Sequence, residues 1–183
     1  MCLVDGSPHS AVFDLWNPAL PGFSTDNHVL LNTTGYLTQL LAALRSHDVR
    51  VLAVVWSPGA IRAALRFREM GLLPSPTFWQ LGFTGPAVPG GPPATQTGLA
   101  AYLEQLPADE PWTVHVRDGQ GLEMAEWAVA RGGHVSIGLG DYPYEELGLP
   151  WNSDLVRVVA GFAEKYGRPV ADPSAARALL GFP

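Results

Sequence analysis

The sequence has a single cysteine, Cys2, among its 183 residues. One thiol cannot form an intramolecular disulfide, and it cannot supply the several thiolates of a cysteine-based zinc site. A chain with so little cysteine fits a reducing compartment better than an oxidising one. We therefore expect a cytoplasmic protein that has no disulfide bond.

An excess of positive charge and a long apolar run are also missing. Lys and Arg number 11 against 17 Asp and Glu, and the formal net charge is −6. An acidic chain without a basic stripe is a poor binder of nucleic acid. No apolar run reaches the roughly 18 residues of a membrane-spanning helix, and no basic segment precedes an apolar core near Met1, as it would in a signal peptide. We expect neither nucleic acid nor a membrane as a partner.

The balance of residue types is that of a globular protein, and the length suits a single domain over residues 1–183. Hydrophobic residues make up 47% of the chain and charged residues 15%, which is too apolar for a disordered chain. Short apolar runs predict strands at Met1–Val4, Val49–Trp56, Thr77–Phe83, Trp112–Val116 and His134–Leu139. The stretch Asp5–Asn32, rich in Pro, Gly, Asn and Ser, predicts a long irregular loop.

Helical patterns separate the predicted strands. Apolar residues at helical spacing, with capping residues before several of them, predict helices after Thr33 or Thr34, after Ser57 and after Pro93, over Gly121–Arg131 and Asn152–Tyr166, and a short one after Asp172. Strands that alternate with helices of 10–15 residues form right-handed βαβ units with a parallel sheet. The sequence therefore predicts an α/β fold with about five parallel βα units.

Common enzyme signatures are missing. The Gly138-Leu139-Gly140 stretch lacks the G-x-G-x-x-G spacing of a dinucleotide-binding loop. No G-x-S-x-G elbow marks a nucleophilic serine, and the five histidines show neither an H-x-H nor an H-E-x-x-H spacing. These absences argue against a Rossmann dehydrogenase, a serine hydrolase and the common histidine-pair zinc motifs.

Three stretches, taken together and in order, resemble the beta-keto acid cleavage enzymes. Gly132–Asp141 reads GGHVSIGLGD, where the family has a strand GGHVRVGLEDN. Val88–Thr95 reads VPGGPPAT, similar to the family's PGG-x-PAT before a helix. The segment Asn152–Gly181 resembles the family's ending SNAQLV…GRE-A-TPAEAREILG. Because order and spacing also agree, the resemblance covers nearly the whole chain.

The resemblance implies a fold and a reaction. The family fold is a (β/α)₈ barrel, and this chain corresponds to its strands four to eight, a partial TIM barrel. The family joins a beta-keto acid with acetyl-CoA to give acetoacetate and a new acyl-CoA, with a divalent metal, usually zinc. Five strands cannot close a barrel of eight. We therefore expect the open edges to pair in a homo-oligomer, or with a chain that supplies the missing strands.

The departures from the family pattern concern its catalytic groups. The glutamate that is the family's third zinc ligand corresponds to Gly140, and the arginine that holds the keto acid corresponds to Ser136. The family's acidic positions on an earlier strand correspond to Val54 and Ser57, and its HLH-type zinc motif has no counterpart. We expect zinc to be absent or weakly bound. The alternative to an enzyme is a non-catalytic or truncated family member that acts as a binding or interaction module.

In a barrel of this kind, functional side chains lie at the carboxyl ends of the strands and in the loops that follow them. By this rule, the candidate catalytic residues are Asp141, His115 and Arg117. The candidate substrate-binding residues are Ser7, Thr84, Ser136 and Asp118. The loop Gly85–Pro93 can cradle a phosphate of coenzyme A through backbone amides, or it can serve only as a rigid connection, since it contains no Lys or Arg.

The candidates also have structural interpretations. Asp141 stands before a proline-containing turn, a position that aspartate favours for local hydrogen bonding. Thr113, His115 and Arg117 are every second residue of one predicted strand, so their side chains share a face, which can be the inside of a barrel. A single histidine on a strand is, however, often only a packed residue. Arg117 and Asp118 can bind an anionic substrate or pair with each other, and such a surface pair stabilises little.

Overall fold

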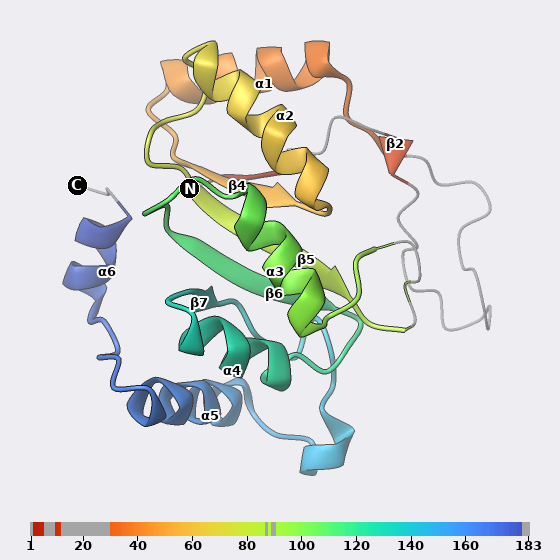
Figure 1. Ribbon diagram of the computed structural model, residues 1–183, viewed down its shortest axis with the longest axis vertical. Coiled ribbons are helices and arrows are strands. Elements are labelled where there is room, and N and C mark those ends of the chain that lie inside the picture. Colours follow the sequence, from red (N-terminus) through yellow and green to blue (C-terminus); the bar gives the residue numbers. More distant parts are fainter. Residues whose placement is uncertain (1, 6–9, 12–29, 87, 89–90, 181–183) are drawn as a thin grey trace.

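The computed structural model describes residues 2–5, 10–11, 30–86, 88 and 91–180. One parallel sheet runs through the molecule in the order β1-β4-β5-β6-β7, which follows the order along the chain (Figure 1). Its strands are β1 Cys2–Asp5, β4 Val51–Val55, β5 Phe78–Thr84, β6 Trp112–Arg117 and β7 His134–Val135. Among the described residues, β1 and β7 each pair with one neighbour only. The predicted α/β class and the parallel sheet are confirmed.

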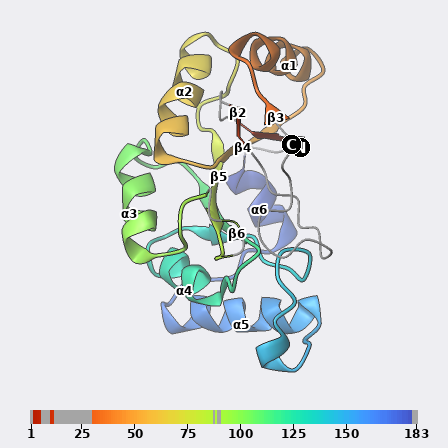
Figure 2. The same cartoon turned by 90° about the vertical axis from the view of Figure 1, so that its right-hand side faces the viewer.

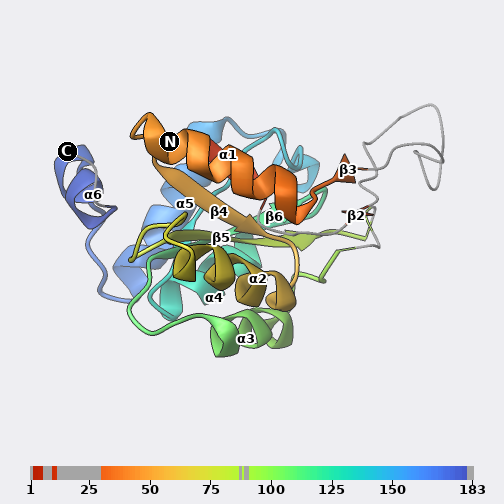
Figure 3. The same ribbon diagram turned by 90° about the horizontal axis from the view of Figure 1, so that it is seen from above.

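Helices connect the strands. They are α1 Thr34–Ser46, α2 Pro58–Glu69, α3 Gln96–Gln105, α4 Leu122–Ala130, α5 Asn152–Lys165 and α6 Pro173–Leu179, with a short 3₁₀ turn, η1, at Glu145–Leu147. Figure 2 shows α2, α3 and α4 following one another along one face of the sheet, and Figure 3 shows the same three helices from above. None of the helices in the described part of the chain has the length and apolar character of a membrane span.

Side-chain hydroxyls and carboxylates fix where several helices begin. Ser57 Oγ accepts a hydrogen bond from Ala60 N at 3.3 Å, and the proline after Ser57 has the backbone angle of a first helical residue. Thr33, Thr95 and Asp172 cap α1, α3 and α6 in the same way. Such caps satisfy amide groups that have no partner inside the helix. They confirm the starts predicted after Ser57 and Asp172 and select Thr33 as the cap of α1, whereas α3 begins after Thr95 and not directly after Pro93.

The core lies between the sheet and the helices. On β5, Trp79, Leu81 and Phe83 are fully buried in this core. Because side chains alternate between the two faces of a strand, Gly82 and Thr84 belong to the opposite face. In β6, which pairs with β5, His115 and Arg117 lie opposite Gly82 and Thr84 and so share this second face of the sheet. These polar side chains of β6 belong to the candidate site.

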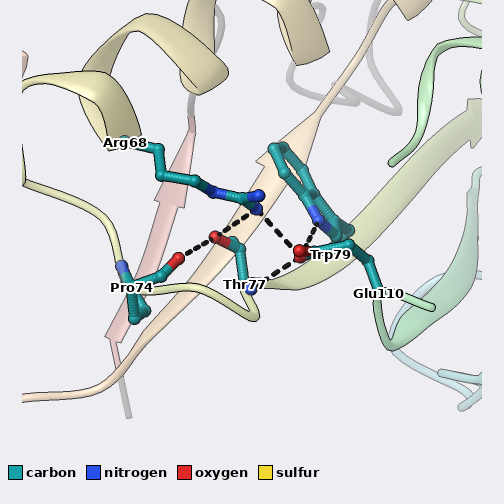
Figure 4. A network of polar contacts seen from close by, with 5 residues as sticks. All are labelled: Arg68, Pro74, Thr77, Trp79 and Glu110. Carbon is teal, nitrogen blue, oxygen red and sulfur yellow. Dashed lines mark hydrogen bonds and ion pairs between the residues drawn. The ribbon is translucent and has the colours of Figure 1, made fainter. Parts of the chain in front are cut away.

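A buried ion pair holds the amino ends of β5 and β6 together (Figure 4). Glu110 Oε2 accepts hydrogen bonds from Arg68 Nη2 at 2.8 Å, Thr77 N at 2.6 Å and Trp79 Nε1 at 3.0 Å. The Arg68 guanidinium also lies over the Trp79 ring, 5.8 Å from its centroid. These contacts lie at the amino ends of the strands, away from the candidate site.

The last strand is shorter than predicted. We expected a strand over His134–Leu139, but β7 ends at Val135. Ser136 N still donates to Val114 O at 2.9 Å, but the chain then leaves the sheet. Leu139 packs with Ile137 into a second apolar cluster around Leu155 of α5, and its amide donates to Asn152 Oδ1 at 2.9 Å. Packing against α5 replaced the strand pairing that the apolar pattern suggested.

Other expectations were wrong in detail. Ser10–Ala11 and Leu30–Leu31 form a short antiparallel pair, β2 and β3, inside the stretch predicted to be irregular throughout. Tyr36, in the first turn of α1, is 53% exposed, whereas Leu37 and Leu41 of the same helix are buried. Trp151, which precedes α5, is also exposed.

A candidate active site at the carboxyl ends of the strands

Two of the predicted catalytic residues, His115 and Asp141, lie next to each other. His115 stands near the end of β6, and its Nε2 lies 3.5 Å from Asp141 Oδ1. Asp141 is held by its backbone: its amide donates to Gly138 O at 3.2 Å, and its carbonyl accepts from Asp118 N at 2.9 Å. Asp141 therefore closes a turn that begins at Gly138, and its carboxylate lies beside the histidine.

Burial controls the protonation of His115. Loss of solvent lowers the pKa of the imidazole, and the charge of Arg117 lowers it further, whereas the carboxylates of Asp141 and Asp118 raise it. The lowering prevails, so the ring is neutral near pH 7. His115 Nδ1 is buried without a hydrogen-bond partner in the described part of the chain. A neutral imidazole beside a carboxylate is able to accept a proton.

Arg117 and Asp118 pair with each other at the end of β6. Arg117 Nε lies 3.2 Å from Asp118 Oδ2, and Asp118 has a left-handed backbone with φ of 52°. The Arg117 side chain is 38% exposed, so the guanidinium can be reached by solvent. The pair matches the structural interpretation of these residues, and it keeps a cation within the same cluster as His115.

The indole of Trp56 closes one side of the cluster. A Cβ at Gly82 would lie 2.6 Å from Trp56 Cε3, closer than such contacts occur, so glycine makes room for the ring. The indole meets the His115 ring edge to face, with centroids 5.8 Å apart. We named Trp56 only as a strand-end residue. The pairing of Val55 with Leu81 in adjacent strands puts Trp56 opposite Gly82, and that register is the signal for the contact.

The predicted substrate-binding residues do not form a single group. Thr84 is buried under the loop that follows β5, where a Cβ at Gly91 would lie 2.3 Å from its methyl group. Ser136 lies instead beside Asp141, and both line a void of about 10 Å³, at the lower limit for one water molecule. Ser7 lies outside the described residues. Asp118 is in the cluster, as described above.

Tyr144 is buried beside the candidate site, and the sequence did not predict this position. Its side chain is 2% exposed, its backbone is left-handed with φ of 54°, and its hydroxyl accepts from Gly121 N at 3.2 Å. Burial raises the pKa of the phenol, so it stays protonated. The ring lines the same void as Asp141. A proline-containing turn gave no indication that this tyrosine would be buried.

Backbone hydrogen bonds join the loops around the site. Gly85 N donates to Arg117 O at 2.8 Å, and Asp118 N donates to Asp141 O at 2.9 Å. These bonds join the loop after β5 to the end of β6, and the loop after β6 to the loop after β7.

The donor set for a metal is incomplete in this region. Within the described residues, no three His, Cys, Asp or Glu side chains stand close enough to hold a metal ion. Gly140, beside Asp141, has no side chain to offer, and a Cβ built there would meet nothing within 4 Å. The residues in place do not fit a zinc centre of three protein ligands.

Comparisons with known proteins give a consistent result. A family model described as beta-keto acid cleavage enzyme matches residues 5–182. The chain is 30% identical over 157 residues to the 3-keto-5-aminohexanoate cleavage enzyme of Acetoanaerobium sticklandii, covering 85% of this chain and 56% of that protein. It is 41% identical over 96 residues to the 3-oxoadipate:acetyl-CoA acetyltransferase of Cupriavidus necator, covering 50% of this chain and 34% of that protein.

A third relative is the 3-dehydrocarnitine:acetyl-CoA trimethylamine transferase of Rhizobium meliloti. It is 25% identical over 159 residues, which cover 86% of this chain and 52% of that protein. The chain thus spans about half the length of the curated relatives it matches.

Proposed function

Because the chain belongs to the beta-keto acid cleavage enzyme family, we propose that it exchanges acyl groups between a beta-keto acid and acetyl-CoA. The products are acetoacetate and a new acyl-CoA. The observation that carries the proposal is the pair formed by His115 and Asp141 at the carboxyl ends of the strands, 3.5 Å apart. A relative named for its use of acetyl-CoA supports the same co-substrate.

The proposed exchange needs a base and no redox partner. It breaks the bond between C2 and the ketone carbon of the beta-keto acid, and the carbon–sulfur bond of acetyl-CoA. It forms a carbon–carbon bond between C2 and the acetyl group, which gives acetoacetate, and a carbon–sulfur bond between the released acyl group and coenzyme A. Carbon–carbon bond formation at C2 requires removal of a proton from that carbon. His115 is neutral because burial lowers its pKa, and in this proposal it takes that proton while Asp141 holds the imidazolium.

Arg117 is the cation assigned to the substrate carboxylate. Ser136, at the position where the family resemblance expects an arginine, cannot make a two-pronged contact with a carboxylate. Arg117 is bound to Asp118 but keeps a 38% exposed side chain, so a substrate carboxylate can share its guanidinium. Thr84 and Ser136 stay predictions as substrate-binding residues, and no role is assigned to Ser7.

Zinc has no part in the proposed steps. The family's metal does not fit the residues present, since Gly140 carries no ligand and the described residues contain no three-ligand group. Absent or weak zinc binding stays a prediction, to be measured on the purified protein.

We also propose that residues 1–183 form one domain, the C-terminal portion of a (β/α)₈ barrel, and that the chain works as a homo-oligomer. In the described residues, β1 and β7 are edges with one neighbour each, and parallel strands are seldom left unpaired. A separate chain that supplies further strands would satisfy the same edges. The cytoplasmic location stays a prediction from the single cysteine.

The second candidate function is a non-catalytic module that binds the same small molecules without converting them. The loss of the zinc-ligand position at Gly140 and of the arginine position at Ser136 favours it. A panel of beta-keto acids with acetyl-CoA, assayed for acetoacetate with and without added zinc, separates the two. Turnover supports the enzyme, and binding of coenzyme A without turnover supports the module.

A further inference from the structure

A hollow of about 360 Å³ lies at the amino ends of β4 and β5, the ends of the strands away from the candidate site. The turn between α1 and β4, within residues 45–51, forms one rim, and the loop between α2 and β5, within residues 71–74, forms the other. We call it the amino-end hollow. Its volume falls in the range of roughly 300–1,000 Å³ that is usual for small-molecule sites. In Figure 1 the two connections lie at the left-hand ends of β4 and β5.

Two arginines give the amino-end hollow an excess of positive charge. Arg45, in the last turn of α1, and Arg50, just before β4, line it together with one carboxylate, that of Asp48. In the described part of the chain, no ion pair includes any of these three residues. The formal net charge of the whole chain is −6, so a cationic hollow is opposite in sign to the chain and suits an anion.

The guanidinium of Arg45 is held between the two rims. Its Nη1 donates a hydrogen bond to Gly71 O, on the opposite rim. Gly71 has a left-handed backbone with φ of 72°, and a Cβ there would lie 3.2 Å from Arg45 Nη1, so glycine leaves room for the guanidinium. Because a guanidinium has five N–H donors, this bond leaves other donors of Arg45 for a ligand.

Backbone and side-chain hydrogen bonds fix both rims to the fold. On the first rim, Val49 N donates to Leu44 O at 2.9 Å. On the second, Pro74 O accepts from Thr77 Oγ1 at 2.6 Å, and Thr77 N donates to the buried carboxylate of Glu110 (Figure 4). The amino-end hollow is therefore formed by the fold itself, before any ligand binds.

Apolar side chains form most of the remaining walls. Val51 and Leu73 are buried, and Val49, Leu72 and Pro74 line the hollow beside them. Contact with such walls stabilises a ligand in proportion to the apolar area that is covered. A ligand that matches the amino-end hollow therefore has an anionic end and an aliphatic body.

The balance of charge selects the anionic group. Two guanidinium groups and one carboxylate leave an excess of one positive charge in the lining. A single carboxylate neutralises that excess, whereas a phosphate dianion leaves negative charge over and gains little from apolar walls. A carboxylate also matches the geometry of arginine, which binds it through two parallel N–H···O bonds.

We propose that the amino-end hollow binds a small monocarboxylate with a short aliphatic chain, whose carboxylate is held by Arg45 and Arg50. This is a second site, separate from the one around His115 and Asp141. Among the described residues that line it, none is assigned to the proposed reaction. The inference therefore stands or falls independently of the proposed function.

The test uses butyrate as the probe and measures its binding by saturation-transfer NMR. All titrations are made in an Arg117→Gln background, because Arg117 is the other cation proposed to bind a carboxylate. We expect Arg45→Gln and Arg50→Gln each to weaken butyrate roughly tenfold, as for loss of a charged hydrogen-bonded pair. Arg62→Gln, on the exposed surface of α2 and outside the lining, is the matched control and should bind butyrate normally.

A competition experiment tests the chemical class. Inorganic phosphate at the concentration of butyrate and at constant ionic strength should leave the butyrate signal unchanged. Displacement of butyrate by phosphate under these conditions overturns the assignment to a monocarboxylate.

The remaining outcomes decide the site. Saturable binding that survives Arg117→Gln and is weakened by Arg50→Gln but not by Arg62→Gln supports the inference, even if the chain has no turnover. Equal affinity in Arg50→Gln overturns it, and so does equal weakening in Arg62→Gln, which would reflect net charge alone. No saturable binding in Arg117→Gln also overturns it, because butyrate would then bind only at the candidate site. If Arg45→Gln melts early, Arg50→Gln decides alone.

Discussion

Asp141 Oδ1 lies 3.5 Å from His115 Nε2, and this carboxylate opposes the burial that lowers the pKa of the imidazole. His115 lies on β6 and Asp141 lies in the turn after β7. The hydrogen bond from Asp118 N to Asp141 O holds that turn against the end of β6. Burial therefore sets the direction of the pKa shift of His115, Asp141 reduces its size, and the pair has a pH signature that can be measured.

The first prediction concerns the pH profile of the reaction. Because the pKa of His115 is lowered, the acid limb of kcat/KM should have its midpoint below the ordinary imidazole value of about 6.5. Asp141→Asn removes a group that raises this pKa, so the acid limb should move to still lower pH. Initial rates measured in buffers from pH 4.5 to 8 give the kcat/KM profiles of the unmodified chain and of Asp141→Asn. A midpoint that stays in place in Asp141→Asn would show that the carboxylate does not act on the histidine.

The second prediction concerns the fit of Trp56 against Gly82. Gly82→Ala adds a Cβ 2.6 Å from the indole, and we expect a loss of about 1–3 kcal/mol in the free energy of unfolding from overpacking. Gly161→Ala is the control, because that glycine lies inside α5 with open space around its Cβ position. The control should raise stability by roughly 0.5–1 kcal/mol. Chemical denaturation gives both values, and equal effects would contradict the contact.

The third prediction compares a buried ion pair with an exposed one. Glu110 is 6% exposed and accepts three hydrogen bonds (Figure 4), so Glu110→Ala should cost about 3–5 kcal/mol of unfolding free energy. Glu69 pairs with Arg66 on the surface, where the side chains are 60% and 77% exposed. Glu69→Ala should cost less than about 1 kcal/mol. A small loss for Glu110→Ala would mean that the network at the amino ends of the strands does not stabilise the fold.

The fourth prediction concerns the open edges of the sheet. With β1 and β7 each paired on one side among the described residues, we expect self-association at micromolar concentration. Size-exclusion chromatography with light scattering should give a mass well above the 19.6 kDa of one chain. A stable monomer with a sharp cooperative melt would refute this prediction, and it would mean that other parts of the chain cover the edges.

The order of strands and helices could be predicted because it depends on local patterns. Ser57 before a proline fixed the start of α2, and the apolar run around Val51–Val55 fixed a buried strand. The end of β7 could not be predicted in this way. Leu139 follows the apolar pattern of a strand, but its packing against Leu155 is a long-range contact that no local pattern contains.

The site was predictable in part for the same reason. His115 was predicted because it lies near the carboxyl end of a strand, on the same face as Arg117. Asp141 was predicted from the family motif. The indole of Trp56 depends on the space above Gly82, and the buried phenol of Tyr144 depends on a left-handed turn. Both require knowledge of where neighbouring strands and loops stand.

The measurement that tests the account most directly is the transfer of isotope from acetyl-CoA to acetoacetate. The unmodified chain and a His115→Gln variant are each incubated, in separate reactions, with a panel of beta-keto acids and [¹³C]acetyl-CoA, with and without zinc. Labelled acetoacetate is followed by NMR. We predict label in acetoacetate with at least one keto acid, without a need for zinc. His115→Gln should slow its appearance roughly 100- to 10,000-fold, as expected for loss of a general base. No label with any keto acid, or an equal rate in His115→Gln, would contradict the account.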